Sequence, residues 1–251
     1  MAHRSDWVTR DLEPRVVRRT LAAVVAMTIL VASVVYVRGR RSAHNDVQRY
    51  RTDVGQIVVA GLGDGNRAVL APRTTLHVTT EHGVRVATLH GQVQFLIADT
   101  APPFEVRAEG ITVRAHGAIF DIRRYDDDVD AQVVALHGTV VAHGQHALVT
   151  VTPGMMTRIS DSAVAPVATV DTAAVTGWMQ GRLIFQDTPI SSVLATLDRW
   201  YRYEFRLADS ALGVRHVTIT LPIGTLSETI DRLHTLLGVT ATVEDSVVTI
   251  K

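Results

Sequence analysis

The stretch TLHVTTEHGVRVATLHGQVQFLIA, residues 75–98, indicates a β-strand region. Short runs of Thr, Val, Leu and Ile alternate in it with turn signals such as His82-Gly83. In TLHVTT the apolar residues have a period of two, which places Leu76 and Val78 on the same face of a strand. The same pattern extends from this stretch in both directions, from Val54 to about Ser160, with turn signals every eight to twelve residues. This spacing is typical of an all-β domain, which we assign to residues 54–160.

Two features inside this β region bear on its architecture. Asp64-Gly65 is a strong hairpin signal, because the turn requires positive φ values that glycine adopts at little cost. LHGQV at 89–93 and LHGTV at 136–140 nearly repeat each other. Two related strand-turn-strand units are consistent with a β-sandwich of similar halves and equally with a short β-solenoid. Two copies are too few to choose between these folds.

The character of the sequence changes after this region. Residues 161–176 are rich in Ala, Val and Thr and contain Pro166, which favours a linker. Residues 177–251 then alternate strand patterns with two helical patterns, in the order β-α-β-β-α-β, the last of these strands beginning a terminal hairpin. We therefore predict a small α+β module with both helices on one face of a sheet.

Both predicted helices have recognisable ends. For the first helix, in DTPISSVLATLDRWY, Asp187 or Thr188 can cap the N-terminus and Pro189 suits the first turn. For the second, Thr225 and Glu228 form a capping box, in which the hydroxyl accepts from the third amide and the carboxylate reaches back. Gly238 is a plausible end of that helix.

An uncharged apolar run, TLAAVVAMTILVASVVYV, occupies residues 20–37. As a helix it would extend roughly 26 Å, enough for a thin bilayer core. We expect a single-pass membrane anchor, preceded by a short cytoplasmic stub (1–19) and followed by a polar juxtamembrane linker (38–53). A cleaved signal peptide is the alternative, but the run is long for one and RGRRSAHND is a poor cleavage context. Arginines flank both ends of the run, so charge does not set its orientation; the short stub favours export of the body.

The composition excludes several classes of function. Positive and negative residues balance at 25 each and aromatic residues make up only 5%, so neither a basic footprint nor a stacking surface for nucleic acid is present. The chain has no cysteine, which excludes disulfides, thiolate catalysis and cysteine zinc sites. No nucleophile elbow, P-loop or zinc-protease motif occurs. We expect no enzyme activity, cofactor or metal, although folding could assemble a site from distant residues.

Three side-chain clusters could carry chemistry, and each has a simpler explanation. His137, His143 and His146 could bind Zn or Cu, but two of them precede glycine, where a turn is the simpler interpretation. The carboxylates of the run DDDVD (Asp126, Asp127, Asp128 and Asp130) lack the spacing of a calcium loop and favour a solvated turn. The aromatic residues Trp178, Trp200 and Tyr201 could form a ligand platform, but the helical spacing of Trp200 and Tyr201 favours a core or an interface.

Six short sequence blocks follow one another along the chain: YRTDVG (Tyr50, Thr52, Gly55), LGDGNRAVL, RVATLHGQVQF, PFEV, GAIFDI and ALHGTV. In their order and spacing they resemble the FecR family of inner-membrane signal transducers. The C-terminal module resembles a short STN-type module. Gln92 replaces the usual Glu and Ala118 the usual Thr, which implies altered local hydrogen bonds. The family's helical anti-sigma domain is not matched by residues 1–19, which are too few to form a bundle.

The resemblance implies a periplasmic sensor, anchored once in the inner membrane, that transduces a signal by protein–protein contact. Its expected partners are the signalling domain of an outer-membrane TonB-dependent transporter and, directly or through a separate anti-sigma chain, an ECF sigma factor. A passive envelope scaffold or ligand-binding module is the alternative function.

We expect partner binding by strand addition at exposed sheet edges of the C-terminal module. The candidate residues are Val217 and Ile219 in VTITL and Val247, Val248 and Ile250 in the terminal strand. If that terminal strand is an edge, replacing Val248 by Pro should weaken binding without unfolding the module.

Overall fold

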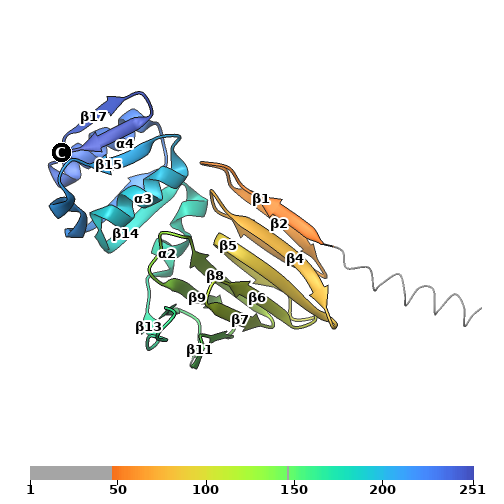
Figure 1. The fold of residues 1–251 in the computed structure, drawn as a ribbon. Coiled ribbons are helices and arrows are strands. Elements are labelled where there is room, and N and C mark those ends of the chain that lie inside the picture. The colour runs from red at the N-terminus through yellow and green to blue at the C-terminus, as the bar shows by residue number, and fades with distance from the viewer. Residues whose placement is uncertain (1–46, 146) are drawn as a thin grey trace, which may run out of the picture. The chain divides into compact units, whose positions relative to one another are not determined.

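The computed structural model describes residues 47–145 and 147–251 (Figure 1). The predicted stub and membrane segment lie outside these residues. Among the residues described, no helix has the length and apolar character needed to cross a bilayer. The polar linker predicted for 38–53 is too long at its C-terminal end, because residues 48–51 form a strand paired with residues 75–78.

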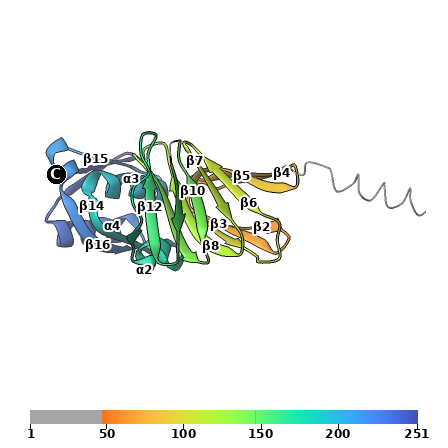
Figure 2. The same ribbon diagram turned by 90° about the horizontal axis from the view of Figure 1, so that it is seen from below.

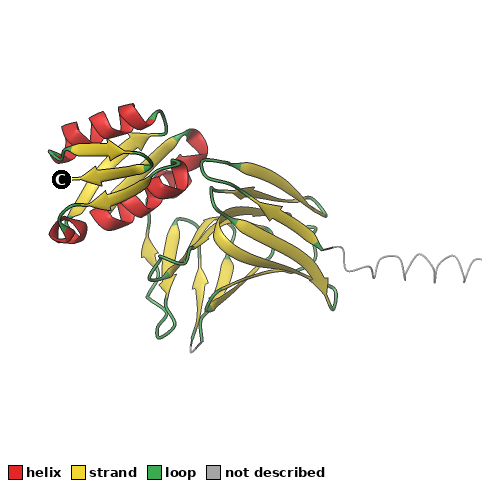
Figure 3. Ribbon diagram, turned by 45° about the horizontal axis from the view of Figure 1, so that its top comes forward, coloured by secondary structure: helices red, strands yellow, loops and turns green. Residues whose placement is uncertain are grey.

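Twelve strands from Gln48 to Ile159 form the part that we call the β lobe. Figure 3 shows it as strands and loops, and the described residues of this range contain no helix, in agreement with the predicted all-β domain. The strands are β1 (Gln48–Arg51), β2 (Val58–Gly63), β3 (Asn66–Leu70), β4 (Thr75–Glu81), β5 (Val84–Ile97), β6 (Phe104–Ala108), β7 (Ile111–Ala115), β8 (Ala118–Arg124), β9 (Ala131–His137), β10 (Val140–His143), β11 (Leu148–Val151) and β12 (Met155–Ile159).

The long strand β5 organises the β lobe by changing partners halfway along its length. Its first half, Val84–His90, pairs with β4 and β6, whereas its second half, Gly91–Ile97, pairs with β8 and, in part, β3. The change occurs at Gly91, which has φ +112° and lies so close to Thr74 that a Cβ would be 2.8 Å from its Cα. Only glycine fits this backbone, so the first LHG repeat marks the point where the sheet divides.

The two halves of the sheet enclose one hydrophobic core. Phe95 from the second half of β5 stacks on Phe120 of β8 with ring centroids 5.2 Å apart, and it also meets Phe104 of β6 at 5.7 Å. Leu76 and Val78 are fully buried in the same core, which confirms their predicted common face. Apart from β5–β6, the strand pairs of the β lobe are antiparallel, unlike the stacked parallel strands of a β-helix (Figure 2). With one core between the two halves, the lobe has the character of a sandwich.

Turn residues behave as the sequence predicts at the first hairpin. Asp64 and Gly65 connect β2 to β3 with φ values of +53° and +80°. The second LHG repeat differs from the first, because His137-Gly138 ends β9 and starts the turn to β10. The two repeats therefore share sequence but occupy different places in the strand pattern.

The predicted linker contains ordered elements. Strand β13 (Ala168–Thr169) pairs with β12, and Asp171 caps the five-residue helix α2 (Thr172–Thr176). A 3₁₀ turn, η1 (Gly177–Gln180), then leads into the C-terminal part of the chain.

Residues 182–251 form the part that we call the C-terminal module. Its elements are β14 (Arg182–Pro189), α3 (Ile190–Trp200), β15 (Glu204–Leu207), η2 (Ser210–Val214), β16 (His216–Pro222), α4 (Leu226–Leu237), β17 (Ala241–Glu244) and β18 (Val247–Ile250). The predicted order of strands and helices is confirmed. The predicted single sheet is wrong, since β14 pairs with β16 in one sheet and β15, β18 and β17 form another.

The sequence predicted both ends of α4 but not the N-terminal cap of α3. Helix α4 has the expected capping box between Thr225 and Glu228, and Gly238 ends it at φ +69°. For α3 the expected cap is wrong. Pro189 occupies the N-cap position without a side-chain bond, and Asp187 lies in β14 with φ +46° at a bulge.

One hydrophobic cluster unites both sheets and both helices of the module. It includes Leu197 from α3, Leu233 from α4, Leu221 from β16 and Val248 from β18, each buried to 1% exposure or less. Among the aromatic residues, Trp178 belongs to this cluster, and Trp200 and Tyr201 pack against it. The core interpretation of these residues is therefore confirmed.

Candidate functional site

The terminal strand does not offer the free edge that we expected. Strand β18, which contains Val247, Val248 and Ile250, lies between β15 on one side and β17 on the other. Val248 is fully buried and Ile250 is 1% exposed. The edge assignment for these residues is wrong, and a proline at Val248 would disrupt a central strand and the core together.

Strand β16 has the expected arrangement. It pairs only with β14, so its other side lacks a strand neighbour among the described residues. Val217 faces the core, Ile219 packs against it in part, and Thr218 and Thr220 are exposed. An extended partner segment could add to this edge through main-chain hydrogen bonds, with side-chain contacts to Ile219.

A buried guanidinium group lies where the β lobe meets the C-terminal module. The guanidinium of Arg199, near the end of α3, is 6% exposed and forms an ion pair with Asp127 of the β8–β9 turn. It also stacks over the ring of Tyr125, with 3.9 Å between the guanidinium carbon and the ring centroid. We call these three residues, together with Asp128, the Arg199 cluster.

The acidic turn is consequently not the solvated turn that we predicted. Asp128 accepts hydrogen bonds of 2.8–3.2 Å from Arg123 and one of 3.0 Å from the backbone amide of Tyr125. Burial tends to raise the pKa of Asp128, but the bonds and charge of Arg123 outweigh it and lower that pKa. Asp127 is half exposed and Asp126 is exposed, so only part of the run is solvated.

Each of the three family residues in the YRTDVG block makes a specific contact, and the last of them contacts Arg199. The Tyr50 hydroxyl donates to the carbonyl of Gly61 on the neighbouring edge strand at 2.8 Å. The buried Thr52 hydroxyl donates to Ala71 at 2.6 Å and accepts from the Thr74 amide at 2.8 Å. The Gly55 amide donates to the Arg199 carbonyl at 2.9 Å. A Cβ at Gly55 would be 2.9 Å from the Trp200 carbonyl oxygen, so the close approach requires glycine.

Strand β3 and Ala71, the residue directly after it, contribute to both hydrophobic cores. Leu70 is fully buried in the β lobe, whereas Ala71 belongs to the cluster of the C-terminal module and Val69 packs against it. Alternate side chains of a strand point to opposite faces, so this one segment is covered on both sides. The β lobe and the module are therefore in apolar contact beside the Arg199 cluster.

The two family positions that differ here have distinct environments. Gln92 donates from its amide to the buried carboxylate of Asp121 at 3.0 Å. Burial raises the pKa of Asp121 to about 7, against smaller lowering effects of Gln92 and Arg123. A glutamate at 92 would place a second carboxyl group on Asp121, so glutamine removes a charge conflict. Ala118 is buried at the start of β8.

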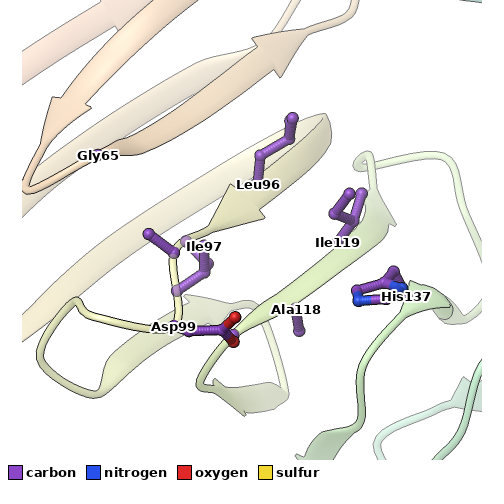
Figure 4. A pocket seen from close by; sticks show the side chains of 9 residues that line it. Gly65, Leu96, Ile97, Asp99, Ala118, Ile119 and His137 are labelled. Carbon is purple, nitrogen blue, oxygen red and sulfur yellow. The ribbon is translucent and has the colours of Figure 1, made fainter.

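A small open pocket lies elsewhere on the β lobe. It measures about 230 Å³ and is lined by Gly65, Leu96, Ile97, Ala98, Asp99, Gly117, Ala118, Ile119 and His137 (Figure 4). Asp99 and His137 are both exposed at its margin. Of the three histidines considered as a metal site, His146 lies outside the described residues, and the described residues hold no group of three metal-binding side chains.

Comparisons with known proteins agree with this architecture. Residues 48–141 match the family described as FecR protein, and residues 182–250 match FecR, C-terminal. The chain belongs to the FecR family. A comparison with curated protein sequences finds no significant match.

Solved structures give the same fold. Two crystal structures, at 1.65 and 2.50 Å resolution, of a candidate anti-sigma factor from Parabacteroides distasonis superpose with a TM-score of 0.74 at 23% identity. Each covers 81% of this chain and 98% of the solved chain. At this identity the likeness concerns the fold.

Sequence reasoning missed Arg199 altogether. It lies next to Trp200 on α3, outside the apolar positions from which the helix was predicted. The one available signal was the acidic run 126–130, which could have indicated an arginine partner. Which arginine fills that role depends on a contact between residues 72 positions apart.

Proposed function

We propose that this protein regulates a sigma factor, and that its body outside the cytoplasm receives the signal through protein–protein contact. Membership of the FecR family is the observation that supports this function most strongly. The fold shared with a candidate anti-sigma factor is consistent with it. In this proposal the chain is a single-pass inner-membrane protein, and the signal comes from the signalling domain of an outer-membrane transporter.

The contact surface that we propose is the free side of β16. Among the described residues this side of β16 pairs with no strand, so its main-chain groups can pair with an extended segment. No cofactor or reaction is needed, because regulation requires only that a partner bind one state of the protein better than another. We also propose that the C-terminal module is of the STN type.

A deletion strain tests the regulatory role. Genome-wide transcripts are compared among the parent, a strain lacking this chain and the deletion strain complemented with it. Regulation predicts that a discrete set of transcripts with a shared promoter sequence changes on deletion and returns on complementation. An unchanged transcript profile under conditions that express the protein would overturn the proposal and favour a passive envelope scaffold.

A further inference from the structure

The polar contacts between the β lobe and the C-terminal module converge on one residue. Within the described ranges, both hydrogen bonds that join residues 48–159 to residues 182–251 use Arg199. Its side chain binds Asp127, and its carbonyl accepts from Gly55. Arg199 therefore contacts two separate segments of the β lobe, the β8–β9 turn and the loop after β1.

The surroundings make this guanidinium a strong connection. It is buried, flanked by the Tyr125 ring and by two carboxylates, with Asp128 at 3.9 Å from its Nη2. Withdrawal of Asp127 would leave a buried cation with weaker compensation, which is costly. Since Asp127 is itself half exposed, the pair lies at the margin of the contact, where a partner could compete for it.

The loop that Arg199 holds lies close to the entry of the β lobe. Gly55 is four residues after β1 (Gln48–Arg51), the first described strand. Thr52, between them, is held by its hydroxyl, which donates to the Ala71 carbonyl and accepts from the Thr74 amide, and by its own amide, which donates to the Thr74 carbonyl. The hydrogen bond from the Gly55 amide to the Arg199 carbonyl therefore joins α3 to the loop that follows the first described strand.

We propose that the Arg199 cluster is a latch that couples the C-terminal module to the first segment of the β lobe. In the latched state α3 holds the loop 52–55 in place. A partner protein bound to the module releases Arg199 from Asp127 and frees that loop. This inference rests on the proposed function for its biological role, but the latch itself is a property of the isolated chain.

Distance measurements on the full chain in detergent test the latch. The chain has no cysteine, so spin labels can be attached to cysteines introduced at the exposed positions Val59 and Val243. The variant Asp127→Arg places a second guanidinium against Arg199. Asp126→Arg is the matched control, because it makes the same change at a neighbouring, 86% exposed side chain. Electron paramagnetic resonance then gives the distribution of label distances.

We expect one narrow distribution for the parent and for Asp126→Arg, and a broadened or second distribution for Asp127→Arg. Hydrogen exchange at the Gly55 amide should rise about tenfold in Asp127→Arg, since its acceptor is the Arg199 carbonyl. Arg199→Ala should behave like Asp127→Arg. If Arg199→Ala fails to fold, the surface variant decides alone. Unchanged distances and unchanged Gly55 exchange in Asp127→Arg would overturn the latch.

Transcript measurements separate this inference from the proposed function. If deletion of the chain changes transcripts, the latch predicts that Asp127→Arg changes the same transcripts and Asp126→Arg does not. If the label distances change in Asp127→Arg but those transcripts stay at the parental level, the coupling role is overturned. If deletion changes no transcripts, the proposed function fails, whereas the distances still decide whether the latch exists.

Discussion

The buried carboxyl group of Asp121 gives the sharpest quantitative prediction. Its pKa is raised from 3.8 to about 7 by burial, and the side chain is 2% exposed. One carboxylate oxygen accepts from Gln92, and the other has no partner among the described residues. The folded protein therefore favours the protonated form.

The sign of the pH dependence follows from this raised pKa. Below pH 3.8 the group is protonated in both folded and unfolded chains and imposes no penalty. As the pH rises toward 7, the unfolded chain ionises first, so the free energy of unfolding decreases. A shift of about three units corresponds to a full penalty of about 4 kcal/mol above pH 7.

Asp121→Asn removes this titration while keeping an oxygen that can accept from Gln92. Linkage predicts that the free energy of unfolding of the variant, relative to that of the parent, rises by about 2–3 kcal/mol between pH 5 and pH 8. Urea unfolding of the full chain in detergent, followed by near-ultraviolet circular dichroism at several pH values, measures the difference. Subtracting the parent's free energy of unfolding at each pH cancels the contributions of Glu105 and Asp128, whose pKa values are lowered.

Glu244→Gln is a suitable control, since Glu244 is exposed on β17. A constant stability difference between Asp121→Asn and the parent at all pH values would refute the reasoning. It would mean that Asp121 is solvated or paired in the folded protein, contrary to its position in β8.

Three further substitutions test particular elements. Gly91→Ala should cost at least about 2 kcal/mol in urea unfolding, because φ is +112° and a Cβ would overlap Thr74; a neutral effect would contradict the change of partners in β5. Thr225→Ala should cost about 1 kcal/mol through loss of the capping box, and a matched Thr235→Ala on the exposed part of α4 should cost less. Val248→Pro should abolish the near-ultraviolet signal of Trp178 and Tyr201, and retention of that signal would contradict the central position of β18.

Local signals in the sequence predicted the elements that depend on neighbouring residues. Asp64-Gly65 predicted its hairpin, and Thr225 with Glu228 predicted the start of α4, because both patterns act within a few residues. Period-two burial of Leu76 and Val78 follows from strand geometry alone. The FecR resemblance likewise depended on short blocks in a fixed order.

Features set by distant contacts could not be predicted in this way. The sequence of β18 does not reveal that β15 pairs with it in parallel, so a terminal strand was mistaken for an edge. Nothing within the run 126–130 reveals that Arg199 lies against it. Gly91 was recognised as part of a repeat, but a single strand that pairs in two halves of a sheet has no local signature.

Substitutions at the exposed edge of β16 test most directly whether this protein receives its signal there. Thr220→Lys places a charge on this edge strand and should hinder strand addition, whereas Thr150→Lys makes the same change on β11, an edge of the β lobe. Each variant replaces the parent in cells, and the transcripts that depend on this chain are measured at matched protein levels. If the signal is received at β16, Thr220→Lys abolishes their response and Thr150→Lys preserves it. A full response in Thr220→Lys would contradict signal reception at β16.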